Sequence, residues 1–266
     1  MRLVELDEYK KIIIEVMRKL DSICREHNIR YMVIGGTLLG AARHEGLIPW
    51  DDDIDIGMPR EDYDKLAEVI AKEPQHGLNF IRIEENSDTI FPYGKVCDVN
   101  TTVSQLNFKE VEGYGAFVDV FPMYHIPDDE AEREKLRKKM LKKLKVLEHS
   151  SRTGFLKSKS FVTNCKRLAA HILSRPIGTE KQVRKFNQAC IDMNATKTAR
   201  LGLPWLRMYV NAADFDNLSS LKFEGYEVCA PEDYDGALTR FYGDWRKLPP
   251  EEDRVASHNL TCYIKE

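Results

Sequence analysis

The stretch "GLIPWDDDIDIGMP", residues 46–59, decides the fold because it places four carboxylates among residues that favour burial. Like charges this close repel one another, and burying them is costly unless a cation or hydrogen bonds compensate. Hydrophobic residues alternate with the last two acids. In a β-strand this alternation puts Asp53 and Asp55 on one face, while Ile54 and Ile56 are buried on the other.

Two carboxylates on one strand face offer hard oxygen ligands for one or two divalent cations, a ligand type that suits Mg²⁺. A bound cation would also remove the repulsion. Asp51 and Asp52 fall at the entrance to the strand, where we expect a solvated or helix-capping role. A later β-rich run, "FVDVF", carries Asp119. If its strand pairs beside the first, Asp119 completes a three-carboxylate cluster of the kind that supports phosphoryl transfer. Three unrelated loop acids are the alternative.

Upstream, "RYMVIGGT" predicts a short strand that ends in a glycine turn at Gly35 and Gly36. Glycines let the backbone approach a ligand closely, and the N-terminus of the following helix offers free N–H groups to phosphate. We expect Thr37 to cap that helix and Gly46 to end it. A Gly-Gly turn alone is ordinary turn chemistry, but followed by alternating acids it indicates a phosphate site.

Hydrophobic periodicity predicts the remaining elements. Helices are expected over residues 13–24, 37–46, 60–70 and 128–149, with a weaker pattern over 157–176. Strands are expected over 30–36, 78–83, 93–99 and 115–124. The predicted class is α+β or α/β. We divide the chain into a core (1–127), a basic helical insertion (128–200) and a C-terminal part that packs back on the core (201–266).

Composition is that of a globular protein, with 266 residues, 42% hydrophobic and 31% charged. No run approaches the roughly 18 apolar residues of a membrane span. The amphipathic N-terminus carries acids, unlike a signal or transit peptide, so we expect a cytoplasmic location. Six scattered cysteines without a C-x-x-C pair argue against a zinc site or a disulfide framework.

Charge is strongly segregated along the chain. The net charge is −3, yet residues 131–185 hold 17 Lys+Arg against 4 Asp+Glu. Such a segment indicates a polyanionic partner, a membrane surface or a solvated helical face. Few aromatic residues interleave with the bases, which argues against nucleic acid. One face carries Leu136, Met140, Leu144 and Leu147, which could rest on an anionic membrane or pack on the protein's own core.

Taken together, the motifs resemble a known family. The run "IGGTLLGAARHEGLIPWDDDIDIGM" closely resembles the signature of the LicD family, within the nucleotidyltransferase superfamily that shares a fold with DNA polymerase β. The match continues, in order, through "YGKVCDVNTT", "FVDVFPM" and "APEDYDGALTRFYGDWRKLPP". The resemblance implies a polymerase-β-like nucleotidyltransferase core with a mixed sheet.

The same resemblance implies an activity. Family members transfer phosphocholine from CDP-choline to a sugar hydroxyl of a cell-surface glycan precursor, of the teichoic acid or lipopolysaccharide type, and release CMP. The cofactor would be Mg²⁺, with Mn²⁺ as an alternative, and the acceptor would be lipid-linked, in keeping with a location at the inner face of the plasma membrane. Use of another CDP-alcohol such as CDP-ribitol, nucleotidyl transfer to a sugar or antibiotic, and a catalytically silent glycan- or lipid-binding role remain alternatives.

Carried over to this sequence, the family's paired metal ligands match Asp53 and Asp55, and the third carboxylate, also a candidate base, matches Asp119. Gly35 and Gly36 match the phosphate-contacting turn. The other candidates for donor binding are Thr37, Arg43 with the neighbouring His44, Trp50, Lys95, Arg254 and His258. Choline would need aromatic faces. The candidates for these, Trp50 first, are Trp50, Tyr93, Tyr114, Tyr242 and Trp245.

Overall fold

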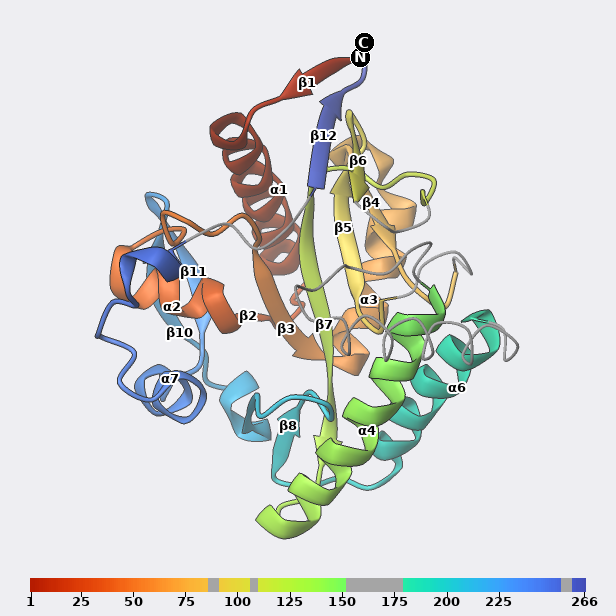
Figure 1. Cartoon of the computed structure of the whole chain (residues 1–266), viewed down its shortest axis with the longest axis vertical. Helices are drawn as coiled ribbons and strands as arrows, with labels where there is room; N and C mark the ends of the chain where they lie inside the picture. Colours follow the sequence, from red (N-terminus) through yellow and green to blue (C-terminus); the bar gives the residue numbers. More distant parts are fainter. Residues whose placement is uncertain (86–90, 106–109, 152–178, 255–259) are drawn as a thin grey trace, which may run out of the picture.

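A mixed β-sheet carries the acid-rich stretch at its centre in the computed structural model, which describes residues 1–85, 91–105, 110–151, 179–254 and 260–266. Its strands lie in the order β2-β3-β7-β5-β4 (Figure 1). Their bounds are Met32–Val33 for β2, Asp55–Pro59 for β3, Phe117–Ile126 for β7, Gly94–Asp98 for β5 and Leu78–Ile81 for β4. Strands β3 and β7 are parallel, and the other neighbours are antiparallel.

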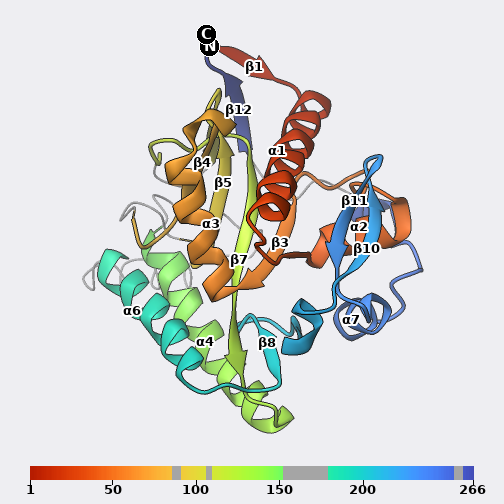
Figure 2. The same cartoon turned by 180° about the vertical axis from the view of Figure 1, so that it is seen from behind.

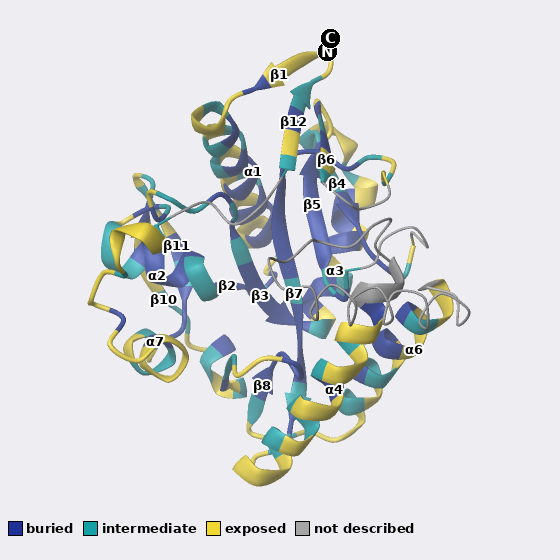
Figure 3. Ribbon diagram, viewed as in Figure 1, coloured by how far each residue is buried: buried dark blue, intermediate teal, exposed yellow. Residues whose placement is uncertain are grey.

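The two central strands are buried along most of their length (Figure 3). Ile56 of β3 and Val118 and Val120 of β7 have no exposed surface. Apolar and β-branched residues of this kind fit a buried, pleated surface. The alternation read from the sequence therefore holds in β3 and β7, with apolar side chains anchoring the strands that carry the acids.

Two long helices cover one face of the sheet, as the view from behind shows (Figure 2). They are α1 (Leu6–Glu26) and α3 (Arg60–Lys72). The predicted apolar stripe of α1 is buried, including Ile13, Met17 and Leu20. Pro59 stands immediately before α3, and acids occupy its first turn, two features that favour the start of a helix.

A smaller layer packs beside the β2 edge. It contains α2 (Gly35–His44), α7 (Tyr234–Tyr242) and the hairpin of β10 (Ser219–Phe223) and β11 (Tyr226–Ala230). The prediction that Thr37 caps α2 is wrong. The helix begins two residues earlier at Gly35, its N-cap is Ile34, and the Thr37 side chain is buried.

The far end of β7 extends beyond the sheet and pairs with β8 (Arg200–Gly202), which pairs with β9 (Tyr209–Asn211). Beside it lie α4 (Glu130–Ser151) and α6 (Thr179–Ile191) (Figure 1). The apolar stripe of α4 faces inward, since Met140 and Leu147 are buried and Leu136 and Leu144 pack against the same clusters. It therefore packs on the protein's own core, and the membrane alternative for this stripe is wrong.

A second, three-stranded antiparallel sheet joins the two ends of the described chain. Its order is β1-β12-β6, with β1 at Arg2–Val4, β12 at Leu260–Ile264 and β6 at Thr101–Gln105. The sequence reasoning missed all three strands. Short 3₁₀ helices complete the fold at Pro74–His76, Asp192–Ala195, Ala212–Phe215 and Glu251–Asp253.

The fold class is mixed, with helices and a mixed sheet, as predicted. The weak helical pattern over 157–176 lies outside the described residues. Within the described ranges, no helix is long and apolar enough to span a membrane. The five cysteines in those ranges are free thiols. The division into three parts stays a prediction.

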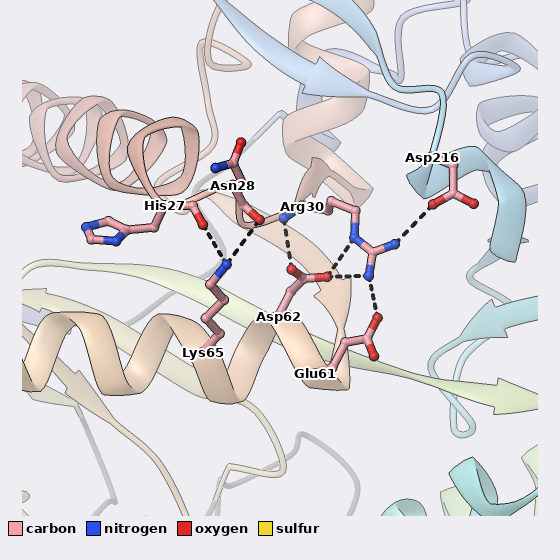
Figure 4. Close-up of polar contacts among 7 residues, drawn as sticks. All are labelled: His27, Asn28, Arg30, Glu61, Asp62, Lys65 and Asp216. Atoms are coloured by element: carbon pink, nitrogen blue, oxygen red, sulfur yellow. Dashed lines mark hydrogen bonds and ion pairs between the residues drawn. The ribbon is translucent and has the colours of Figure 1, made fainter.

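An arginine at the start of β2 ties the sheet to α3 and to the C-terminal part (Figure 4). Arg30 donates to Asp62 from its backbone N (3.2 Å) and from its Nε (2.9 Å). Its other guanidinium nitrogens reach Glu61 and Asp216, at 3.1 Å in the case of Asp216. Asp62 is buried, whereas Glu61 and Asp216 are exposed. The buried carboxylate therefore holds the turn between α1 and β2.

We predict that Asp62→Ala lowers the free energy of unfolding by about 1–3 kcal/mol, because it leaves the Arg30 backbone N–H without its acceptor. Glu61→Ala is the matched control. It removes an acid from the same helix turn and the same guanidinium, but at an exposed site, so we expect a loss within about 0.5 kcal/mol. Urea denaturation followed by circular dichroism measures both. Equal losses in the two variants would contradict the role given to Asp62.

Candidate functional site

Three carboxylates meet at the centre of the sheet. Oxygen atoms of Asp53, Asp55 and Asp119 all lie within 4.8 Å of one another. The parallel pairing of β3 and β7 places Asp55 directly opposite Asp119. The strand pairing on which the sequence argument depended is therefore present, although Asp53 lies just before β3 and not within it.

Backbone hydrogen bonds fix the acids from both sides. The Asp119 N–H donates to the Ile54 carbonyl (2.8 Å), and the Ile34 N–H donates to the Asp55 carbonyl (3.1 Å). The Thr37 hydroxyl accepts a hydrogen bond from the Asp55 N–H at 2.7 Å. Thr37 thus joins α2 to the acid-bearing strand. Sequence reasoning gave this residue another role because the contact spans 18 positions.

The two glycines at the start of α2 let the helix approach the acids. A Cβ atom on Gly35 would lie 3.2 Å from the Asp55 Oδ2, and one on Gly36 would lie 2.7 Å from the Asp51 Oδ2. Gly35 also has a φ of +56°, a conformation that side chains disfavour. These positions require glycine because the first turn of the helix lies against the carboxylates.

The remaining acids of the opening stretch belong to the same site. Asp51, Asp52 and Asp53 also have oxygens within 4.8 Å of one another. Asp52 is 2% exposed, so the expectation of a solvated role is wrong for this residue. No local pattern indicates this burial, since three consecutive acids are typical of an exposed turn.

Lys95 on β5 compensates part of the charge. Its ammonium donates to the Asp119 carboxylate at 2.5 Å, and both side chains are nearly inaccessible to solvent. The same ammonium lies 3.7 Å from the centroid of the Phe117 ring, and further rings surround it at 4.7–5.8 Å, those of Phe91, Tyr93 and Tyr114. The structure thus pairs Lys95 with an acid, while the phosphate contact stays a prediction.

Crowding of the carboxylates changes their proton affinity. Burial, together with the nearby Asp53, Asp119 and Asp51, raises the pKa of Asp55 well above its ordinary value. Burial, together with Asp55, Asp51 and Asp53, also raises the pKa of Tyr242, at the end of α7. Tyr242 therefore lies within the electric field of the acids. A buried acid such as Asp55, whose pKa is raised by neighbouring acids, is typical of a functional site, and this one is suited to a bound cation.

Basic and aromatic side chains line the rim around α2. Arg43 donates to the Trp245 carbonyl (2.8 Å) and to the His44 ring (3.0 Å). The Arg254 guanidinium lies over the Trp50 ring, 5.5 Å from its centroid. Burial, and the proximity of Arg254, lower the pKa of Arg43. The structure therefore brings Arg43, Trp50 and Arg254 into one neighbourhood. His258 lies outside the described residues.

The five aromatic candidates fall into different surroundings. Tyr93 and Tyr114 surround Lys95, and each also stacks on a neighbouring phenylalanine. One face of Trp50 is covered by Arg254, and one face of Trp245 is covered by Arg246. Tyr242 lies near the acids and, together with Gly35, lines a pocket. Of the five, Tyr242 is therefore the one best placed to contact a ligand beside the acids.

The acid cluster is chemically suited to a hard divalent cation. Carboxylate oxygens are the ligands such ions prefer, and three that converge can bind one ion together. Without a cation, the single positive charge of Lys95 faces several buried or half-buried acids. The donor set therefore fits Mg²⁺ or Mn²⁺.

Comparison with known proteins gives concordant matches. Residues 28–158 match the family described as LicD/FKTN/FKRP, nucleotidyltransferase domain. The lipopolysaccharide cholinephosphotransferase LicD of Haemophilus influenzae is 27% identical over 274 aligned residues, which cover 99% of this chain and 100% of that protein. The ribitol 5-phosphate transferase FKRP of human and of mouse is 46% identical over 59 residues, covering 22% of this chain but 12% of FKRP.

We predict a pH dependence of stability from Asp55 when divalent cations are removed with EDTA. Between the ordinary and the raised pKa, the folded state binds a proton that the unfolded state lacks, so stability falls as pH rises through the raised pKa. The asparagine in Asp55→Asn has no carboxyl group to ionise, so it stays neutral at every pH in this range. The variant's melting temperature should exceed that of the wild type at about pH 8, with the difference shrinking toward about pH 5.

Differential scanning calorimetry across this pH range measures the effect. Glu26→Gln, which neutralises an exposed acid on α1, is the control and should follow the wild type. A constant difference between Asp55→Asn and the wild type at every pH would contradict the prediction.

Proposed function

The chain belongs to the LicD family, and on that premise we propose that it transfers phosphocholine from CDP-choline to a sugar hydroxyl of a cell-surface glycan precursor, releasing CMP. The observation that carries the proposal is the end-to-end match to a lipopolysaccharide cholinephosphotransferase, which spans 99% of this chain. A lipopolysaccharide or teichoic acid precursor, carried on a lipid, is the proposed acceptor class. The converging acids on β3 and β7 support the proposed transfer reaction.

We further propose a polymerase-β-like core that holds Mg²⁺, or alternatively Mn²⁺, through Asp53, Asp55 and Asp119. The metal, when bound, would neutralise charge on the diphosphate and on the departing oxygen of CMP. The donor set described above supports this assignment. The hydrogen bond from the Lys95 ammonium restricts the orientation of the Asp119 carboxylate, which supports a role in such a site.

The chain's own residues would position the reactants. The N–H groups at the start of α2, beside Gly35 and Gly36, can donate to a donor phosphate. Arg43 and Arg254 supply positive charge at the rim. The acceptor hydroxyl would attack the distal phosphorus in line with the bond to CMP, so that a phosphorus–oxygen bond forms as the bond to CMP breaks.

The proton of the attacking hydroxyl needs an acceptor among the acids. We expected Asp119 to serve, but its carboxylate already accepts from the Lys95 ammonium, which reduces its affinity for another proton. We therefore assign the base role to the pair Asp53 and Asp55, of which Asp55 lies against Gly35 at the start of α2.

A cytoplasmic location with peripheral contact at an anionic membrane is part of the proposal. The support comes from α4, whose exposed face carries Lys135, Lys138, Lys139, Lys142, Lys143 and Lys145. The apolar side chains of α4 are used in the core, so contact would be electrostatic and would weaken as salt increases.

A second candidate donor is CDP-ribitol, favoured by the local match to a ribitol 5-phosphate transferase. A third candidate reaction, nucleotidyl transfer to a sugar or antibiotic, would release pyrophosphate and not CMP. We expect that incubation with CDP-choline, a glycan acceptor and Mg²⁺ gives CMP. Parallel reactions with CDP-ribitol, CDP-glycerol and nucleoside triphosphates, with CMP and pyrophosphate measured separately, distinguish the three. Pyrophosphate without CMP would overturn the proposal.

We predict that Asp53→Ala and Asp55→Ala each lower the rate of CMP formation by at least about a hundredfold, because each removes an oxygen ligand from the site. Glu26→Gln serves as the control and should keep the wild-type rate, since Glu26 is exposed at the end of α1. Initial rates at saturating Mg²⁺ and CDP-choline measure the effect. Retention of activity in both aspartate variants would exclude the cluster as the reaction centre.

A further inference from the structure

We propose that a pocket lined by four arginines binds a phosphate group of the acceptor, at a position separate from the hydroxyl that reacts. The inference rests on the proposed transferase function and names a feature of its acceptor. The pocket has a volume of about 340 Å³ and lies where α4, α7 and the β8–β9 connection meet. Its arginines are Arg133, Arg137, Arg207 and Arg240.

Positive charge predominates in the pocket. Four arginines face two acids, Glu130 and Glu134. Glu134 forms ion pairs with Arg137 at 2.7 Å and Arg207 at 3.4 Å, and Arg240 forms an ion pair with Asp233 at 3.3 Å, outside the lining. The four arginines still outnumber these acids, so the pocket keeps a net positive charge. A guanidinium has five N–H donors arranged to match phosphate, so one carboxylate does not exhaust two arginines.

An aromatic ring organises the other two arginines. The guanidinium carbons of Arg133 and Arg240 lie 4.6 and 5.7 Å from the centroid of the Tyr209 ring. Arg133 also donates to the Pro127 and Asp128 carbonyls, each at 2.9 Å. These contacts hold guanidinium groups from α4 and α7 around one ring, which reduces the entropy lost when an anion binds.

The pocket adjoins a second, small pocket that reaches the start of α2. This second pocket, lined by Gly35 and Tyr242, shares Arg207, Tyr209 and Arg240 with the first. Gly35 lies against Asp55, and Tyr242 lies in the field of the acids. A ligand whose anionic group occupies the arginine pocket would therefore reach the acids past Tyr209 and Arg240, toward Gly35.

Charge decides which substrate this path accommodates. Arginines repel the quaternary ammonium of choline, and the donor diphosphate is already assigned to the start of α2. A sugar chain that carries a phosphate fits the remaining space. That phosphate could belong to the glycan itself or to the diphosphate that links a glycan to its lipid carrier.

Isothermal titration calorimetry with soluble probes tests the inference. Glucose 1-phosphate represents a glycan phosphate, farnesyl diphosphate represents the lipid-linked diphosphate, and methyl glucoside is the uncharged control. We expect at least one anionic probe to bind the wild type, more weakly as salt increases, and methyl glucoside not to bind. The probe that binds more tightly identifies the source of the phosphate.

Variants test the residues in both directions. Arg207→Gln combined with Arg240→Gln should weaken binding about tenfold or more, since it removes two charge-assisted donors. Glu134→Gln should tighten it, because it releases Arg137 and Arg207 from their acid, an effect that a merely structural role would not produce. Arg184→Gln, an exposed arginine on α6 that does not line the pocket, should leave the affinity unchanged.

Two results would overturn the inference: no binding of either anion to the wild type, or equal affinity in the wild type and the double arginine variant. CMP formation from CDP-choline by the wild type is measured separately. Its absence would refute the proposed function, whereas the titrations would still decide whether the pocket binds phosphate.

Discussion

Repulsion among carboxylates at the centre of the sheet is the constraint on which the rest of the structure depends. Asp55 and Asp119 lie opposite each other across the parallel pair β3 and β7, so their backbones cannot separate without breaking the ladder of backbone hydrogen bonds. Lys95, on the other neighbour of β7, supplies one buried countercharge. Buried charges are tolerated only when they are paired or bound to cations. The sheet therefore holds the acids in place, and the proposed cation would offset their remaining repulsion.

Helices α2 and α7 both contribute residues beside the acid cluster. The first turn of α2 approaches it through two glycines and is joined to β3 by the Thr37 hydroxyl. The last turn of α7 contributes Tyr242 beside the acids and Arg240 to the arginine pocket. The sheet thus carries the acids of the site, and the helices around it carry arginine side chains and aromatic rings.

The sequence predicted those parts whose signal is local. Alternation of acid and apolar residues predicted the faces of β3 and β7, and helical spacing predicted α1, α3 and α4, because these patterns repeat over a few residues. The cap assigned to Thr37, the exposure assigned to Asp52 and the surroundings of Lys95 depended on contacts between distant segments, and no local pattern encodes them. The short strands β1, β6 and β12 were missed for the same reason, since their pairing joins residues from both ends of the chain.

The arginine pocket shows why a site can escape sequence reading altogether. Its four arginines come from α4, from the β8–β9 connection and from α7, so they are separated by up to about a hundred positions and share no motif. This separation has a consequence for how such a protein changes over generations. Mutations in α4, α7 or the β8–β9 connection can alter the partner molecule while the backbone ladder that aligns the acids is left untouched. The acids of the reaction and the arginines proposed to select the acceptor lie on different segments of the chain. The acceptor can therefore change during evolution while the acid-bearing strands stay the same.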